Sequence, residues 1–114
     1  MNKIYIPKNP NLDVMTTAWL VSSVDKIDEV NIQTVPATWG GESMTDDDIC
    51  IGLNSPEGEL GLRIRYGVNK GGNMKSCFSY YLEGIDENLA SPFNSLATYL
   101  DLSLTSKGPW PKTN

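Results

Sequence analysis

The chain has 114 residues, a length that fits one domain with one hydrophobic core. Its formal net charge is −5, and its 9 basic residues are scattered, which disfavours binding to a nucleic-acid backbone. Histidine is absent, which excludes Ser-His-Asp and Cys-His catalysis and the common zinc sites. What remains is carboxylate chemistry, a carboxylate site for Mg²⁺, Mn²⁺ or Ca²⁺, or binding without catalysis.

No stretch resembles a signal peptide or reaches the roughly 18 apolar residues of a membrane span, so we expect a cytoplasmic protein that does not act at membranes. Cys50 and Cys77 are too few for a disulfide framework, and both belong to apolar runs, so we expect them to be buried. We expect a single domain over residues 1–108 and a loosely held tail over residues 109–114. No cofactor is indicated.

The first part of the chain predicts a β-α-β unit. Lys3–Pro7 alternates and is rich in β-formers, which predicts a strand, and the breaker loop "KNPN" follows it. From Asp13 to about Val24 the pattern is helical. The expected buried face of this helix comprises Val14, Ala18 and Val21, widened by Met15, Trp19 and Leu20. The segment "EVNIQTVPA", residues 29–37, alternates at Val30, Ile32 and Thr34 and predicts a second strand.

Two further strands are expected in the middle of the chain. The run "ICIGL", Ile49–Leu53, is continuously apolar, as is typical of a strand buried on both faces of a parallel sheet. We expect it to lie beside the Lys3–Pro7 strand at the centre of the sheet. The segment "ELGLRIRYGV", residues 59–68, alternates apolar and polar side chains and predicts a half-exposed edge strand.

Two helices finish the predicted fold. The apolar positions of the first are Phe78, Tyr81, Leu82 and Ile85, and those of the second are Phe93, Leu96, Ala97, Leu100 and Leu104. Ser91-Pro92 is the expected start of the second helix and Lys107-Gly108-Pro109 its expected stop. We expect one core to contain Phe78, Leu82, Phe93, Leu96 and Leu100, and Trp19, Tyr80 and Tyr81 to pack in the core as well.

The element order β-α-β-β-β-α-α predicts an α/β fold of three-layer type. A mostly parallel sheet of three to four strands is expected, flanked by helices, and the first β-α-β unit implies a right-handed crossover.

The loop after the first strand holds the first candidate site, formed by Lys8, Asn9, Asn11 and Asp13. Open α/β sheets bind ligands at the carboxyl ends of their strands, and Asp13 could bind a hard cation. The alternative is an Asx turn with a helix cap, in which Asn11 or Asp13 accepts hydrogen bonds from backbone amides of the first helical turn. We favour the cap and expect Asp13 to fill that role.

Three adjacent carboxylates, Asp46, Asp47 and Asp48, could also be metal ligands. They precede their strand, however, whereas the first loop follows its own. In a parallel sheet these positions lie at opposite edges, so we expect the two groups to stay apart. A solvated acidic turn is the favoured interpretation.

The segment "NKGGN", residues 69–73, precedes a helix and could cradle phosphate, but both phosphate-loop fingerprints are absent. A flexible turn is therefore favoured there. Arg63, Arg65, Lys70 and Lys75 form the only local basic cluster in the sequence. They could dock an anion, or they could protect an edge strand against pairing with another chain.

The segment "IPKNPNLDVMTTAWLV" resembles the opening motif of the DHH phosphoesterase superfamily, in which an apolar strand leads into a His-x-x-Pro-Asp-x-Asp-Ala loop and an Ala-Trp-Leu helix. The family's Asn-Pro-Asp-Leu-Asp variant lies over Asn9–Asp13. The later segments "VPATWGG", "DDDICIGL" and "KSCFSYYLEGI" fall where the family has its second strand, the lead-in to its third strand, and the helix after its Asp-His-His motif. The resemblance implies a nucleotide-binding type of fold and phosphate-ester hydrolysis with paired Mn²⁺ ions.

The chain departs from this motif at the metal ligands. The motif histidine is replaced by Lys8 or Pro7, the first motif aspartate by Asn11, and only Asp13 remains. The Asp-His-His triplet has no counterpart, and we expect no equivalent of the family's second domain within these 114 residues. Because two metal ions about 4 Å apart need several bridging ligands, one aspartate cannot hold them.

The sequence therefore predicts a non-catalytic, DHH-like binding or interaction protein. It does not identify the partner, which could be another protein or a second copy of the chain. Two alternatives remain open. One is a metal-dependent phosphoesterase of reduced type, with Asp13 and a second carboxylate holding a single Mg²⁺. The other is a phage-type acidic inhibitor that covers a basic surface of a host protein.

Overall fold

The computed structural model describes residues 2–41, 43–53, 60–68 and 72–107. Its strands are β1 (Ile4–Pro7), β2 (Ile32–Val35), β3 (Ile49–Ile51), β4 (Leu62–Ile64), β5 (Gly67–Val68) and β6 (Met74–Lys75). Its helices are α1 (Leu12–Val24), α2 (Cys77–Glu83), α3 (Glu87–Ala90) and α4 (Asn94–Lys107), with 3-10 turns at Glu29–Asn31 and Ser91–Phe93. In the described part of the chain, no helix is long and apolar enough to cross a membrane.

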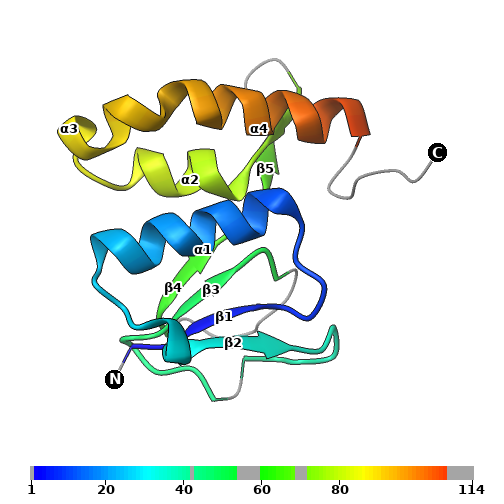
Figure 1. Cartoon of the computed structure of the whole chain (residues 1–114). Helices are drawn as coiled ribbons and strands as arrows, with labels where there is room; N and C mark the ends of the chain where they lie inside the picture. The colour runs from blue at the N-terminus through cyan, green and yellow to red at the C-terminus, as the bar shows by residue number, and fades with distance from the viewer. Residues whose placement is uncertain (1, 42, 54–59, 69–71, 108–114) are drawn as a thin grey trace.

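The predicted α/β fold with a parallel sheet is confirmed. Four strands pair in parallel in the order β2-β1-β3-β4, and β5 and β6 form a separate antiparallel pair. As predicted, β1 and β3 are neighbours at the centre of the sheet, with Ile4 opposite Ile49, and β4 lies at an edge. In Figure 1 the sheet lies at the bottom, α1 and α2 lie above it, and α4 lies beyond α2.

The two faces of the sheet are buried by different material, because side chains alternate along each strand. Toward the helices, the strands present Ile4, Ile6, Ile49, Ile51 and Ile64, which share one core with α1, α2 and α4. On the other face Tyr5 and Cys50 pack with Met44 and Trp39 from the β2–β3 connection. The Tyr5 and Trp39 rings stack with centroids 4.7 Å apart. The long connection thus covers the face that the helices leave open.

The second strand is shorter than predicted. Residues Glu29–Asn31 form a 3-10 turn, and β2 begins only at Ile32. The reason is local, because the Asp28 carboxylate accepts the Val30 backbone N–H at 3.3 Å and so stabilises a turn rather than a strand. Val30, which was predicted to belong to the strand, lies in this turn and is 77% exposed.

Helix α1 buries a narrower face than predicted. Val14, Ala18, Val21 and Leu20 are buried as expected, but Met15 and Trp19 lie on the solvent side. Thr17 is fully buried on the core side. Tyr80 on α2, also predicted to pack in the core, is 42% exposed, whereas Tyr81 is buried.

The last helical region begins earlier than Ser91-Pro92, so the predicted start is wrong. Helix α3 leads directly into the 3-10 turn Ser91–Phe93, which accommodates Pro92, and then into α4. The line of α4 residues that faces the core is Ala97, Leu100 and Leu104, while Leu96 is 36% exposed on the flank. Gly108-Pro109 and the tail 109–114 lie outside the described residues.

Candidate functional site

The loop between β1 and α1 lies at the carboxyl edge of the sheet, as predicted. The Lys8 backbone N–H donates to the Val35 carbonyl at 3.0 Å, which continues the β1–β2 pairing into the loop. The Lys8 and Asn9 side chains are exposed, whereas Asn11 and Asp13 are buried. The four candidate ligands are therefore split, two facing solvent and two facing the interior.

Asn11 is the cap of α1. Its side-chain oxygen accepts the Val14 backbone N–H at 2.9 Å, and its amide nitrogen donates to the Tyr66 hydroxyl at 2.7 Å. One side chain thus satisfies the start of α1 and ties it to the segment after β4. Of the two capping candidates in the sequence, Asn11 holds the role that we predicted for Asp13.

Asp13 instead binds the start of a different helix. Its carboxylate accepts the backbone N–H groups of Cys77 at 2.8 Å and Phe78 at 3.1 Å, and the Thr17 hydroxyl lies 3.5 Å away. Only 3% of its surface is exposed. The expectation that Asp13 caps its own helix is therefore wrong, because the side chain points across the core toward α2.

Side chains satisfy each of the first four backbone N–H groups at the start of α2. Asp13 accepts two of them, Asp101 accepts the Ser76 N–H at 2.8 Å, and the Ser76 hydroxyl accepts the Ser79 N–H at 3.0 Å. The Ser79 hydroxyl also donates to Asp101 at 2.9 Å. These are the groups that a helix cannot satisfy itself and that often bind phosphate. Here two carboxylates and one hydroxyl of the same chain accept them.

Burial controls the protonation of this cluster. Desolvation raises the pKa of Asp13 above its usual value, although the hydrogen bonds from Cys77 and Phe78 oppose that rise. Desolvation, followed by the charge of nearby Asp13, raises the pKa of the Cys77 thiol well above its ordinary value. The pKa of the Tyr66 hydroxyl is also raised, chiefly by burial. A thiol in this state is protonated at neutral pH and is a poor nucleophile.

A small hollow lies beside this cluster at the same edge of the sheet. It has a volume of about 120 Å³ and is lined by Gly52, Leu53, Arg65 and Tyr66. Gly52 adopts φ +70°, and a Cβ there would approach the Val14 Cγ2 atom to 2.5 Å, so a side chain at this position would force the Val14 side chain to move. The hollow is smaller than the roughly 300–1,000 Å³ of a pocket for a drug-sized ligand.

The candidate anion-docking residues lie in different environments. Arg65 is exposed beside the hollow, and Arg63 is half-buried on the Cys50 side of the sheet. Burial raises the pKa of the Cys50 thiol, and the positive charges of both arginines partly offset that rise. Lys75 forms an ion pair with Glu83 of α2. Lys70 lies outside the described residues.

The acidic triplet lies at the amino edge of the sheet, away from the first loop, as predicted. Asp46 and Asp47 are exposed, but Asp48 is 3% exposed, so the expected solvated turn is wrong for this residue. Its carboxylate accepts the backbone N–H groups of Lys3 and Thr45, each at 2.9 Å. Asp48 thereby closes the turn before β3 and holds the chain that enters β1.

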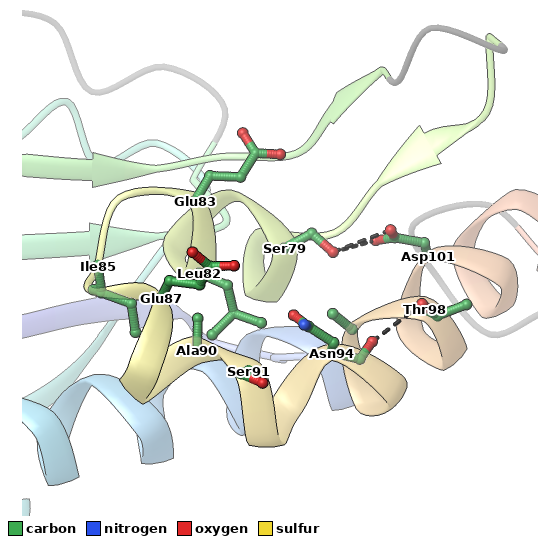
Figure 2. A pocket seen from close by; sticks show the side chains of 11 residues that line it. Ser79, Leu82, Glu83, Ile85, Glu87, Ala90, Ser91, Asn94, Thr98 and Asp101 are labelled. Atoms are coloured by element: carbon green, nitrogen blue, oxygen red, sulfur yellow. Dashed lines mark hydrogen bonds between the residues drawn. The ribbon is translucent and has the colours of Figure 1, made fainter.

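A groove runs between α2 and the helical segment formed by α3 and α4. It has a volume of about 450 Å³, and Glu83, Glu87 and Asp101 contribute carboxyl groups to its walls (Figure 2). Figure 2 also shows Asp101 bonded to the Ser79 hydroxyl. Two of the three carboxylates therefore already have partners within the chain, since Glu83 is paired with Lys75.

Sequence reasoning missed Asp101 and Tyr66. Ser76 was detectable, because a serine directly before an apolar helical run is a common capping signal. No local pattern identifies Asp101 or Tyr66. Asp101 accepts a hydrogen bond from the Ser76 backbone N–H, 25 positions away, and Tyr66 accepts one from Asn11, 55 positions away.

Within the described part of the chain, no three His, Cys, Asp or Glu side chains are grouped so that they could hold a metal ion. No family model matches the chain, and neither a curated protein nor a solved structure matches it.

Proposed function

We propose that the protein is a non-catalytic binding domain related to the DHH phosphoesterases, in which the aspartate left from the metal motif now serves the fold. The relationship is supported by the position of Asn9–Asp13, which follows a central parallel strand and leads into a helix. The resemblance assigns the family's metal motif to this position.

The observation that carries the proposal is the environment of Asp13. Both of its carboxylate oxygens accept backbone N–H groups of α2, and the side chain is almost fully buried. A cation at this carboxylate would have to displace these hydrogen bonds and lie against the positive end of α2. Asp13 is thus engaged as an anion that fixes one helix to another.

The reduced phosphoesterase requires Asp13 to leave α2 and bind Mg²⁺, and the contacts of Asp13 argue against this alternative. The acidic-inhibitor alternative rests on the net charge of −5 alone.

The test is the response of the melting temperature to metal. Wild-type protein is melted with millimolar Mn²⁺ and with a chelator, beside Asn11→Asp, which restores the missing motif carboxylate, and the exposed control Asp46→Asn. We expect the wild-type melting temperature to be the same in both conditions, and no hydrolysis of a chromogenic phosphodiester. A Mn²⁺-dependent rise in wild type that Asp46→Asn retains, together with hydrolysis, would contradict the proposal.

A further inference from the structure

The hollow beside the start of α1 lies where two strands of the parallel sheet end. Gly52 and Leu53 directly follow β3, Arg65 and Tyr66 directly follow β4, and these four residues line the hollow. The carboxyl edge of an open parallel sheet is where α/β folds place their ligands. The hollow therefore has the position of a binding site, and its volume of about 120 Å³ limits what it can hold.

Gly52 leaves one wall of the hollow without a side chain. A Cβ atom at this position would lie 2.5 Å from Val14 Cγ2 and 3.8 Å from the Tyr66 hydroxyl oxygen. The Gly52 backbone and the Tyr66 hydroxyl therefore border the same space. Because Val14 packs so closely and φ is +70°, glycine is the residue that this position accepts, and the hollow stays open.

The Tyr66 hydroxyl has a proton left to donate. The Asn11 side-chain oxygen accepts the Val14 N–H at 2.9 Å, so the Asn11 amide nitrogen is the atom that faces Tyr66, 2.7 Å from the hydroxyl oxygen. Tyr66 accepts in this bond, and its own O–H donates to no residue in the described part of the chain. Burial raises the pKa of the hydroxyl, so it remains a hydrogen-bond donor at physiological pH.

Arg65 supplies a positive charge to the hollow. Its side chain is exposed and forms no ion pair with another described residue, so its guanidinium N–H groups are available to a ligand. Among the residues in the first two positions after each of the four parallel strands, the charged ones are Lys8 and Arg65. Both are positive. The residues where the strands end thus favour an anion, although the net charge of the whole chain is −5.

We propose that the hollow binds one phosphate group, held by the Arg65 guanidinium and the Tyr66 hydroxyl. This inference rests on the proposed binding role and names its ligand. A guanidinium presents a planar pair of N–H groups that matches two oxygens of a phosphate. The other oxygens of this tetrahedral anion can accept the hydroxyl proton from another wall. Arg65 and Tyr66 lie outside the segments that carry the DHH resemblance.

The volume of the hollow fits such a group and little more. A water molecule occupies about 30 Å³ in the liquid, so the hollow has room for about four waters or for one anion of similar total size. A drug-sized ligand needs a pocket several times larger. We therefore expect the phosphate group alone to enter, and any organic part attached to it to remain in solvent.

The first test follows backbone amide NMR signals while inorganic phosphate is added at constant ionic strength in the presence of a chelator. We expect saturable shifts at Gly52, Leu53 and Tyr66. Arg65→Gln should weaken binding by at least about tenfold, because it removes a charge-assisted hydrogen bond. The matched control is Lys26→Gln, which removes an exposed positive charge beyond the other end of α1 and should leave binding unchanged. Absence of saturable shifts, or equal affinities of the two variants, would overturn the proposal.

The second test separates a phosphate site from a general attraction of anions. Arg65→Lys keeps the charge but loses the planar pair of donors, so its affinity for phosphate should lie between those of wild type and Arg65→Gln. Tyr66→Phe removes the hydroxyl donor and should also weaken phosphate binding. Acetate and chloride are titrated into wild type at the same ionic strength, and we expect both to bind more weakly than phosphate. Either anion binding as tightly as phosphate would overturn the assignment.

The outcome is distinguishable from that of the metal test, because the chelator removes free metal ions from the titration. Phosphate binding together with a Mn²⁺-dependent rise in the melting temperature and hydrolysis would keep the site and contradict the non-catalytic role. Absence of both would remove the phosphate site and leave that role.

Discussion

The Asp13 carboxylate accepts the backbone N–H of Cys77 at 2.8 Å, although the two residues are 64 positions apart in the sequence. This contact joins the first helix of the chain to the start of α2, and the same carboxylate also binds the Phe78 N–H. With Asp101 and Ser76, it satisfies the amides with which α2 begins. The Asp13 carboxylate is thus a structural link between two helices.

Replacing Asp13 by asparagine should destabilise the protein strongly. The new amide offers one acceptor and one donor where two N–H groups converge, so at least one buried N–H loses its partner. Hydrogen bonds to charged groups contribute roughly 1.5–3 kcal/mol, and we expect a loss of about that size in urea denaturation. The control is the exposed Asp46→Asn, for which we expect a change within about 0.5 kcal/mol. Equal denaturation midpoints for the two variants would show that Asp13 does not bind α2.

The Asn11–Tyr66 link should be measurable by a double-mutant cycle. Asn11→Ala removes the cap of α1 and should cost about 0.5–2 kcal/mol. Tyr66→Phe removes only the hydroxyl that accepts from Asn11 at 2.7 Å and should cost about 0.5–1.5 kcal/mol. The double variant should lose less stability than the sum of the two single losses, because each substitution breaks the same bond. Strict additivity would mean that the bond contributes nothing to stability.

Two leucines of α4 should behave differently although both fall in the predicted apolar pattern. Leu100 is 2% exposed within the core, and Leu100→Ala should cost about 2–5 kcal/mol through lost burial and a cavity. Leu96 is 36% exposed, and Leu96→Ala should cost less than about 1 kcal/mol. Chemical denaturation of both variants measures the difference. If Leu96→Ala proved the more damaging change, the orientation of α4 would be wrong.

Both cysteines should be unreactive in the folded protein. Cys77 is fully buried, and its thiol pKa is raised by desolvation and by the adjacent Asp13 charge. A raised pKa keeps the thiolate fraction low between pH 7 and 9, and burial keeps the reagent away from both sulfur atoms, so we expect negligible labelling of the native protein across that range. Labelling with a thiol reagent should therefore require unfolding, which a parallel reaction in denaturant would reveal. Rapid labelling of one native thiol at pH 8 would contradict this expectation.

The stability of the protein should fall at alkaline pH through Tyr81. Burial raises the pKa of this hydroxyl from 10.0 to about 12 in the folded state. Since the unfolded chain loses the proton first, folding stability is unaffected below pH 10 and declines as the pH rises from 10 to about 12. Tyr81→Phe should reduce the slope of stability against pH in that window. An unchanged slope in the variant would assign the alkaline loss to other groups.

The sequence determined the elements whose signal is local. The apolar runs of β1 and β3 were sufficient to place them as central, neighbouring strands, and the helical spacing of Phe78, Tyr81 and Leu82 was sufficient to place α2. The absence of histidine restricted the chemistry without any structural information. These conclusions hold because β-propensity, helical period and capping depend on residues a few positions apart.

Only the tertiary structure decided which side of each helix is buried and which groups its polar residues bind. Periodicity shows that Met15 and Trp19 lie near the apolar face of α1, but the position of the sheet and of α2 determines that they are left in solvent. The partner of Asp13 depends equally on long-range packing, because the amides of α2 come within 2.8 Å only after α1 and α2 have docked. A carboxylate next to a capping position looks the same in the sequence whether it caps its own helix or another.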